Sequence, residues 1–335
     1  VLNIGYDLGV LTSEIFTMMV IMALVTTFMT GPALDLINYI FKTKDVFIPD
    51  EIENDGNKYK ILISFGNNEK GKSLLRLASS FVAKQKDITS VTAMQLSLSD
   101  EMHSYNLEEQ ERKRFTPILE ESKVLKQEIT TIFKATVDIE TDIAEIANQG
   151  DYDLLLVGLG KSIFEGTLLG KVLGFTTRII NPDRLIDKLS GKEGLFENSP
   201  FDERTRQIIS KCKMPLGVLI DKDLQQVNRV FVPFFSSEDA FLIDYFQKLI
   251  YNSNSTISLL DINNLVKSNF VMGSAIHSLE DKYPDNIAIL QDRTMKREFL
   301  SKQDLMIISL ESWKKLIDSQ SLWLTHVPSV LILKP

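Results

Sequence analysis

The residues best suited to chemistry are glycines that follow an apolar stretch in the middle of the chain. Residues 153–160 read DLLLVGLG and end in two of these glycines. Glycines let the backbone approach a phosphate, and the start of a following helix offers free N–H groups to an anion. We therefore predict a phosphate-binding loop, against the simpler alternative of a turn that binds nothing. The candidate binding residues are Gly158, Gly160, Ser162, Gly170 and Lys171.

The segments around this loop predict an α/β domain. Apolar, β-rich runs alternate with stretches of helical spacing, a pattern typical of βαβ units and a parallel sheet. An insertion at about 173–204, with Pro182 and Pro200, interrupts the alternation. The expected strands are 58–66, 90–98, 135–140, 153–160 and 215–221, and the expected helices are 72–84, 118–133 and 205–213.

A similar pattern begins again at Arg229, so we predict two tandem domains at 58–222 and 228–335. The expected strands of the second domain are 229–235, 256–262, 286–292, 304–310 and 329–335, with a helix at 238–251. Its fourth strand is followed by no glycine, so we expect no nucleotide there. The apolar strand 329–335 could pair with a second copy of the chain, or the tandem domains could pair with each other.

The N-terminal region predicts a membrane helix. Residues 15–34 carry no charge, and about twenty apolar residues suffice to cross a bilayer. We predict a transmembrane helix at about 15–40 within a segment 1–41, followed by a linker at 42–57; the alternative is a buried helix of a soluble domain. Lys42 and Lys44 directly follow the apolar run, which predicts a cytoplasmic location for the chain after them.

Composition excludes several classes of function. A net charge of −8 argues against nucleic-acid binding, which needs a basic surface. Cys212 is the single cysteine, so no internal disulfide forms. His103, His277 and His326 lie too far apart in sequence to predict a metal site. Nothing resembles a nucleophile elbow, so we predict neither a catalytic residue nor an enzyme.

The N-terminus resembles a transporter family. LNIGYDLGVLTSEIFTMMVIMALVTTFMTGP, above all its part MALVTTFMTGP, is similar to the last membrane helix and preceding loop of bacterial monovalent cation:proton antiporters of the second class. The resemblance implies the bacterial inner membrane, with the bulk of this chain in the cytoplasm. It also implies a lipid bilayer and further membrane helices as partners, with Na⁺ or K⁺ and protons moving through helices upstream of Val1. Asp7 and Glu14 would lie in the extracytoplasmic loop.

The remainder resembles tandem universal stress protein domains, of the adenine nucleotide alpha-hydrolase-like type. Nucleotide-binding members carry G-x2-G-x9-G-[ST] after the fourth strand. Here the first gap is one residue short, and Lys171 stands where Ser or Thr is expected. Asn67 follows the first strand, where the family has an acidic residue. The resemblance implies ATP, AMP or another adenine nucleotide as ligand, and a homodimer.

Together these features predict the C-terminal regulatory portion of a cation:proton antiporter. Its tail would modulate transport and sense an adenine nucleotide. The alternative is a membrane-anchored, universal stress-type nucleotide sensor without transport. A soluble enzyme of the adenine-nucleotide hydrolase type is disfavoured, because no catalytic constellation is visible.

Overall fold

The structure is a computed structural model, which describes residues 12–40, 58–98, 107–159, 201, 203–290, 297–318 and 326–335. Contacts within the chain group it into two compact units, Val1–Ile48 and Pro49–Pro335.

The first unit contains helix α2 (Ser13–Ile40), which occupies the apolar segment. Thr17 and Thr26 return their hydroxyls to the helix backbone: Thr17 Oγ1 donates to the Ser13 carbonyl at 2.8 Å, and Thr26 Oγ1 donates to the Met22 carbonyl at 2.9 Å. Large apolar side chains are exposed along it, including Met18 at 74% and Phe28 at 77%. Within the described residues, no helix combines the length and apolarity that a membrane span requires. The predicted crossing of a bilayer therefore stays a prediction.

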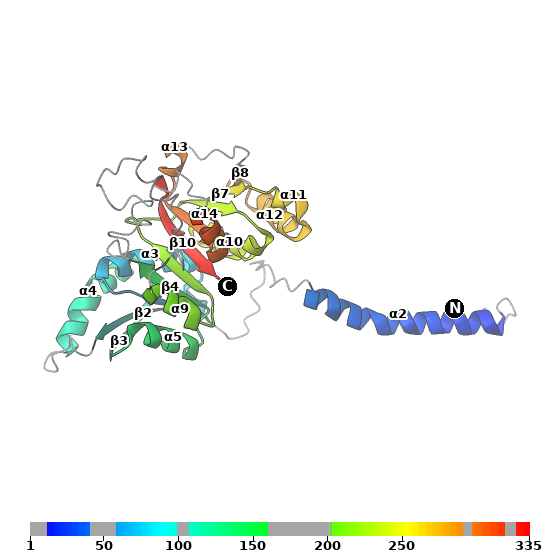
Figure 1. The fold of residues 1–335 in the computed structure, drawn as a ribbon, viewed down its shortest axis with the longest axis horizontal. Helices are drawn as coiled ribbons and strands as arrows, with labels where there is room; N and C mark the ends of the chain where they lie inside the picture. The colour runs from blue at the N-terminus through cyan, green and yellow to red at the C-terminus, as the bar shows by residue number, and fades with distance from the viewer. Residues whose placement is uncertain are drawn as a thin grey trace, which may run out of the picture. The chain divides into compact units, whose positions relative to one another are not determined.

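The second unit is a ten-stranded sheet with helices on both faces (Figure 1). We call β1–β5 with their helices the first half and β6–β10 with theirs the second half. The first half comprises β1 (Tyr59–Ser64), α3 (Asn68–Val82), η1 (Lys86–Ile88), β2 (Thr89–Leu98), α4 (Leu107–Leu125), β3 (Ile129–Thr136), α5 (Ile139–Gln149), β4 (Leu154–Leu159), α9 (Glu203–Lys211) and β5 (Leu216–Ile220). The second half comprises β6 (Arg229–Phe234), η3 (Ser237–Phe241), α10 (Leu242–Ser253), β7 (Thr256–Asp261), α11 (Leu265–Ser268), α12 (Phe270–Lys282), β8 (Ile287–Leu290), α13 (Arg297–Leu300), β9 (Leu305–Ser309), α14 (Leu310–Asp318) and β10 (Ser329–Lys334).

Strand order shows that the two halves repeat one topology. The sheet runs β3-β2-β1-β4-β5-β10-β9-β6-β7-β8, so each half has the same order from its outer edge to the middle. Among the described strands, β5 and β10 alone pair antiparallel, and every other neighbouring pair is parallel. The two predicted segments therefore build one continuous sheet rather than two separate ones.

In each half, an aspartate before the fourth strand accepts a hydrogen bond from the backbone at the start of the first strand. In the first half, the Lys60 N–H donates to the Asp153 carboxylate at 2.7 Å. In the second half, the Arg229 N–H donates to the Asp304 carboxylate at 2.8 Å. Residues at the same distance along these strands are therefore structural equivalents, a relation that matters for the site.

Both faces of the sheet are packed across the junction between the halves. On one face, a single apolar core combines α5 and α9 of the first half with α14 of the second, through Ile143, Ile208 and Trp313. On the other face, α3 contacts α10: the Phe81 and Tyr245 rings lie 6.0 Å apart, and Asn252 Nδ2 donates to the Phe81 carbonyl at 2.6 Å.

Three predictions need correction. The helix expected at 118–133 is wrong, because α4 ends at Leu125 and β3 occupies Ile129–Thr136. The strand expected at 135–140 is wrong for the same reason, since α5 begins at Ile139. β-branched residues favour the extended form in the ITTIF stretch. The strand expected at 329–335 is not a free edge, because β10 is paired on both sides by β5 and β9.

Gly217 tests whether the junction is as tightly packed as the structure indicates. A Cβ atom at this position, the second residue of β5, would lie 2.6 Å from Leu156 Cδ2 and 3.0 Å from Leu331 Cδ1. We expect Gly217→Ala to lower the free energy of unfolding by about 1–3 kcal/mol, because overpacking displaces buried leucines. Urea denaturation measures the change. Gly66→Ala is the matched control, since nothing lies within 4 Å of a Cβ there; an equal loss in both variants would contradict the prediction.

Candidate functional site

A crevice opens at the carboxyl ends of β1, β2 and β4. The chain passes from β1 to β2 on one side and returns to β4 on the other, so the strand order reverses between β1 and β4. Ligands of open parallel sheets bind at such switch points, because the diverging loops leave space between them. The crevice holds two adjoining compartments, which share Gly66, Asn67, Leu96, Ile139 and Arg204.

The apolar compartment has a volume of about 330 Å³. Aliphatic side chains from strands and helices of the first half form most of its wall, and Lys70 of α3 supplies a cation. The apolar wall residues are Phe65, Leu96, Ile139, Ile143, Val157, Leu159 and Ile208, and Ser64, Asn67, Glu140, Arg204 and Thr205 add polar groups. This surface suits a flat apolar group such as a nucleobase.

The polar compartment has a volume of about 470 Å³ and lies at the end of β2. Its polar lining residues are Asn67, Asn68, Gln95, Ser97, Arg114 and Arg204. Arg114 of α4 lies over the Phe133 ring, 5.6 Å from its centroid. Arg204 of α9 pairs loosely with Glu140, at 3.5 Å between Nε and Oε1, and 77% of its side chain is exposed.

Two buried polar side chains of this compartment lack a hydrogen-bond partner among the described residues. They are Gln95 at its Oε1 atom and Ser97 at its Oγ atom, and both side chains are more than nine-tenths buried. Gln95 Nε2 makes one long contact, 3.5 Å from the Gly66 carbonyl. Buried polar groups without partners cost about 1–3 kcal/mol each, so such atoms beside a cavity point to a bound polar group.

Helix starts surround the two compartments. Asn67 caps α3, its Oδ1 accepting from the Glu69 N–H at 2.8 Å. Asp138 caps α5 by accepting from Thr141, and these hydrogen bonds lower the pKa of the Asp138 carboxyl. Arg204 stands in the first turn of α9. The positive ends of three helix dipoles therefore lie at the crevice.

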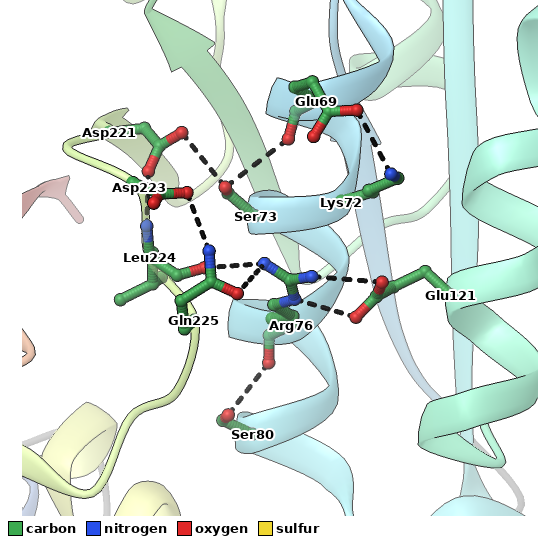
Figure 2. Close-up of polar contacts among 10 residues, drawn as sticks. All are labelled: Glu69, Lys72, Ser73, Arg76, Ser80, Glu121, Asp221, Asp223, Leu224 and Gln225. Atoms are coloured by element: carbon green, nitrogen blue, oxygen red, sulfur yellow. Dashed lines mark hydrogen bonds and ion pairs between the residues drawn. The ribbon is translucent and has the colours of Figure 1, made fainter.

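Behind the crevice, α3 is attached to the connector between the halves (Figure 2). Lys70 pairs with Asp221 at 3.0 Å, and Ser73 Oγ donates to the same carboxylate at 3.0 Å. The Leu224 N–H donates to the other oxygen of Asp221 at 2.8 Å. Burial would raise the pKa of Asp221, but the Leu224 N–H and the Lys70 ammonium outweigh it, and the pKa is lowered.

Arg76 extends this network one turn further along α3. Its guanidinium forms two hydrogen bonds to Glu121 of α4, at 2.7 and 3.1 Å. It also donates to the Leu224 carbonyl at 3.1 Å, as Figure 2 shows. These contacts hold α3, α4 and the connector together, and the hydrogen bonds to Glu121 raise the pKa of Arg76.

Of the predicted binding residues, Gly158 alone lies within the described part of the chain. It borders the apolar compartment as a residue of β4 that pairs with Leu219, within the strand expected at 153–160, and its role in binding stays a prediction. A Cβ atom on it would lie 3.2 Å from Leu74 Cδ1, so the glycine lets α3 approach the strand. The others lie outside the described residues: Gly160, Ser162, Gly170 and Lys171.

Sequence reasoning missed the arginines and the buried polar residues of the crevice. Arg114 and Arg204 come from helices that are distant in sequence, and a lone arginine in a polar helix gives no local indication of a site. Gln95 and Ser97 carried a usable indication: they are polar residues on an otherwise apolar strand at its carboxyl end.

The equivalent position in the second half is filled by the chain itself. The carboxylate of Asp239, fully buried, accepts hydrogen bonds from the Phe235 and Ser236 N–H groups at 2.8 and 3.0 Å. Ser312 Oγ donates to it at 2.7 Å, and Ser309 Oγ donates as well. An internal anion thus occupies the place where the first half has a cavity.

No protein-family model matches the sequence, and no curated protein matches it. The chain is similar to the cytoplasmic domain of a prokaryotic cation chloride cotransporter, at 14% identity and a TM-score of 0.47, over 82% of this chain and 95% of that one. It is similar to a universal stress protein from Archaeoglobus fulgidus at 10% identity and a TM-score of 0.47, over 82% and 97%. A universal stress protein in complex with cAMP aligns at 12% identity and a TM-score of 0.29, over 48% and 97%. At these values the similarities assign no function.

The lowered pKa of Asp221 predicts a defined pH dependence. A carboxyl with a lowered folded-state pKa stabilises the fold above its unfolded pKa of about 3.9, and the contribution is lost as pH falls toward the folded value. We expect wild type to exceed Asp221→Asn in unfolding free energy at neutral pH, with the difference narrowing below about pH 4. Denaturation from pH 7 to 3 measures this. Asp281→Asn, on the exposed side of α12, controls for net charge, and a difference that does not change with pH would contradict the prediction.

Proposed function

We propose that the chain is a regulatory module that binds one adenine nucleotide, in the crevice of its first half. The observation that carries this proposal is the pair of adjoining compartments at the switch point, one with a largely apolar wall and one lined by polar residues and Arg114, with Arg204 bordering both. A nucleotide has the same division, with a flat base at one end and charged phosphates at the other. Adenine is the base that the resemblance to universal stress proteins implies.

The second half supports a stoichiometry of one. Its equivalent position is filled by Asp239 and two serine hydroxyls, and a carboxylate there would repel a phosphate. On this proposal the second half has a structural role: it covers the inner edge of the first half and completes the core under α5 and α9.

The setting we propose is the C-terminal part of a monovalent cation:proton antiporter. It rests on the resemblance of the N-terminal sequence and on the exposed apolar side chains of α2. Transport would reside in other membrane helices, and the nucleotide would bias the transporter by binding one of its states more tightly. No residue in the described part of the chain is assigned a catalytic role in this proposal.

Ile139 offers a test of ligand binding, because it borders both compartments and is half-buried. Calorimetry of the wild-type protein with ATP, ADP and AMP should give one site per chain. Ile139→Trp should weaken binding at least tenfold, because the indole would fill the space where the compartments meet.

Phe270→Trp is the matched control, since it introduces the same side chain at an exposed residue that begins α12. It should bind as wild type does. Wild-type protein that shows neither heat nor a thermal shift with any of the three nucleotides would refute the proposal. Two sites per chain would refute the stoichiometry of one, and unchanged binding by Ile139→Trp would refute the assignment to the first half.

Membrane association can be tested with the first unit. The full chain should float with phospholipid vesicles, and a chain lacking residues 1–48 should remain folded and not float. Met22→Lys places a charge in the middle of α2, where it costs about 2.5–3.5 kcal/mol on insertion, and should reduce flotation. Met22→Leu is the control. Equal flotation of all four proteins would contradict an anchoring role for α2.

A further inference from the structure

We propose that the polar compartment at the end of β2 binds the phosphate of the ligand, through Arg114, Arg204 and Ser97. This inference deepens the proposed function and rests on it. It identifies the ligand class as a nucleoside 5′-phosphate whose base occupies the apolar compartment. It also places the charged end beside α4 and α9, away from Gly158.

The charges around the compartment favour an anion. Arg114 and Arg204 line it, whereas no carboxylate does among the described residues. Arg114 has no carboxylate partner in that part of the chain. Glu140 pairs with Arg204 from the neighbouring compartment, but the long distance and the exposed guanidinium leave that arginine largely available. Guanidinium groups match the geometry of phosphate oxygens, which they bind in pairs.

Helix starts reinforce this charge. The first turns of α3, α5 and α9 contribute Asn68, Ile139 and Arg204 to the lining. These helices also carry acidic residues in their first turns, which would offset the dipoles, but most are paired with basic side chains. The pairs are Glu69 with Lys72, Asp142 with Lys134 and Glu203 with Arg206, whereas Glu140 has only its loose contact with Arg204 and the Asp138 carboxylate caps α5. The positive ends of the helices thus remain effective.

The buried polar residues give an independent indication of a ligand. Ser97 Oγ is buried at the cavity without a described partner, and a hydroxyl there can donate to a phosphate oxygen. Gln95 Oε1 is likewise unpartnered, but it is an acceptor and its Nε2 faces the Gly66 carbonyl, so Ser97 is the hydroxyl donor that a phosphate would use. Helix dipoles alone would not specify a ligand, but they coincide here with two arginines and an unpartnered buried hydroxyl, that of Ser97.

The test compares adenosine with AMP. By calorimetry, AMP should bind wild-type protein at least tenfold more tightly than adenosine does. Arg114→Gln should remove this difference while leaving adenosine binding unchanged, because it removes two donors and a charge. Arg114→Lys should restore part of it. Arg112→Gln, on the exposed side of the same helix, is the matched control and should behave as wild type.

Each result has one reading. The phosphate assignment is overturned if AMP binds Arg114→Gln as tightly as it binds Arg112→Gln. It is also overturned if Ser97→Ala weakens adenosine and AMP binding equally. Neither outcome contradicts nucleotide binding itself. Failure of both adenosine and AMP to bind wild-type protein refutes the proposed function. Inorganic pyrophosphate tests the phosphate site independently of nucleotide binding. If it protects wild-type protein but not Arg114→Gln against thermal unfolding, the phosphate site is supported even when neither adenosine nor AMP binds.

Discussion

The antiparallel pairing of β5 with β10 is the constraint on which the second unit depends. Each half alone would leave an apolar strand at its edge, with a full row of unpaired backbone groups. Joining the two edges satisfies these groups and lets one core continue from α5 and α9 to α14. The close approach needs a residue without a side chain, which Gly217 provides. Because the pairing uses the C-terminal strand, that strand cannot recruit a second copy of the chain.

The two halves share a topology, but one pair of equivalent residues carries opposite charges. Counting along equivalent strands, Lys70 corresponds to Asp239 and Gly158 corresponds to Ser309. In the second half, Ser309 Oγ donates a hydrogen bond to the Asp239 carboxylate, and these two side chains fill the position. In the first half, the Lys70 ammonium pairs with Asp221 instead, and Gly158 has no side chain. The position therefore stays open as part of the apolar compartment. Within the described residues, the two equivalent positions therefore differ: the first half has a cavity there and the second half has a buried carboxylate.

The sequence predicts most of the sheet because its inner strands are short apolar runs bounded by charged or turn residues. It fails around residues 118–140, where Ile129 and Phe133 have spacing that also fits a helix, and Pro117 lies inside α4 instead of ending it. The position of the site at a switch point is predictable from topology. Its arginines are not, because Arg114 and Arg204 meet only after α4 and α9 have packed on the sheet.

The existing ion pairs of Lys70 and Arg204 determine which cations of the crevice can bind an anionic ligand. Lys70 borders the apolar compartment, but its ammonium pairs at 3.0 Å with Asp221, whose side chain is only 5% exposed. Withdrawing the cation would leave that carboxylate buried and uncompensated, at a cost on the order of 3–5 kcal/mol. It would also weaken the attachment of α3 to the connector that follows β5. Arg204 is exposed, and its loose pair with Glu140 is worth less than about 1 kcal/mol. A phosphate therefore gains more from the two arginines than from the lysine, which leaves the stem of Lys70 as a wall for the base.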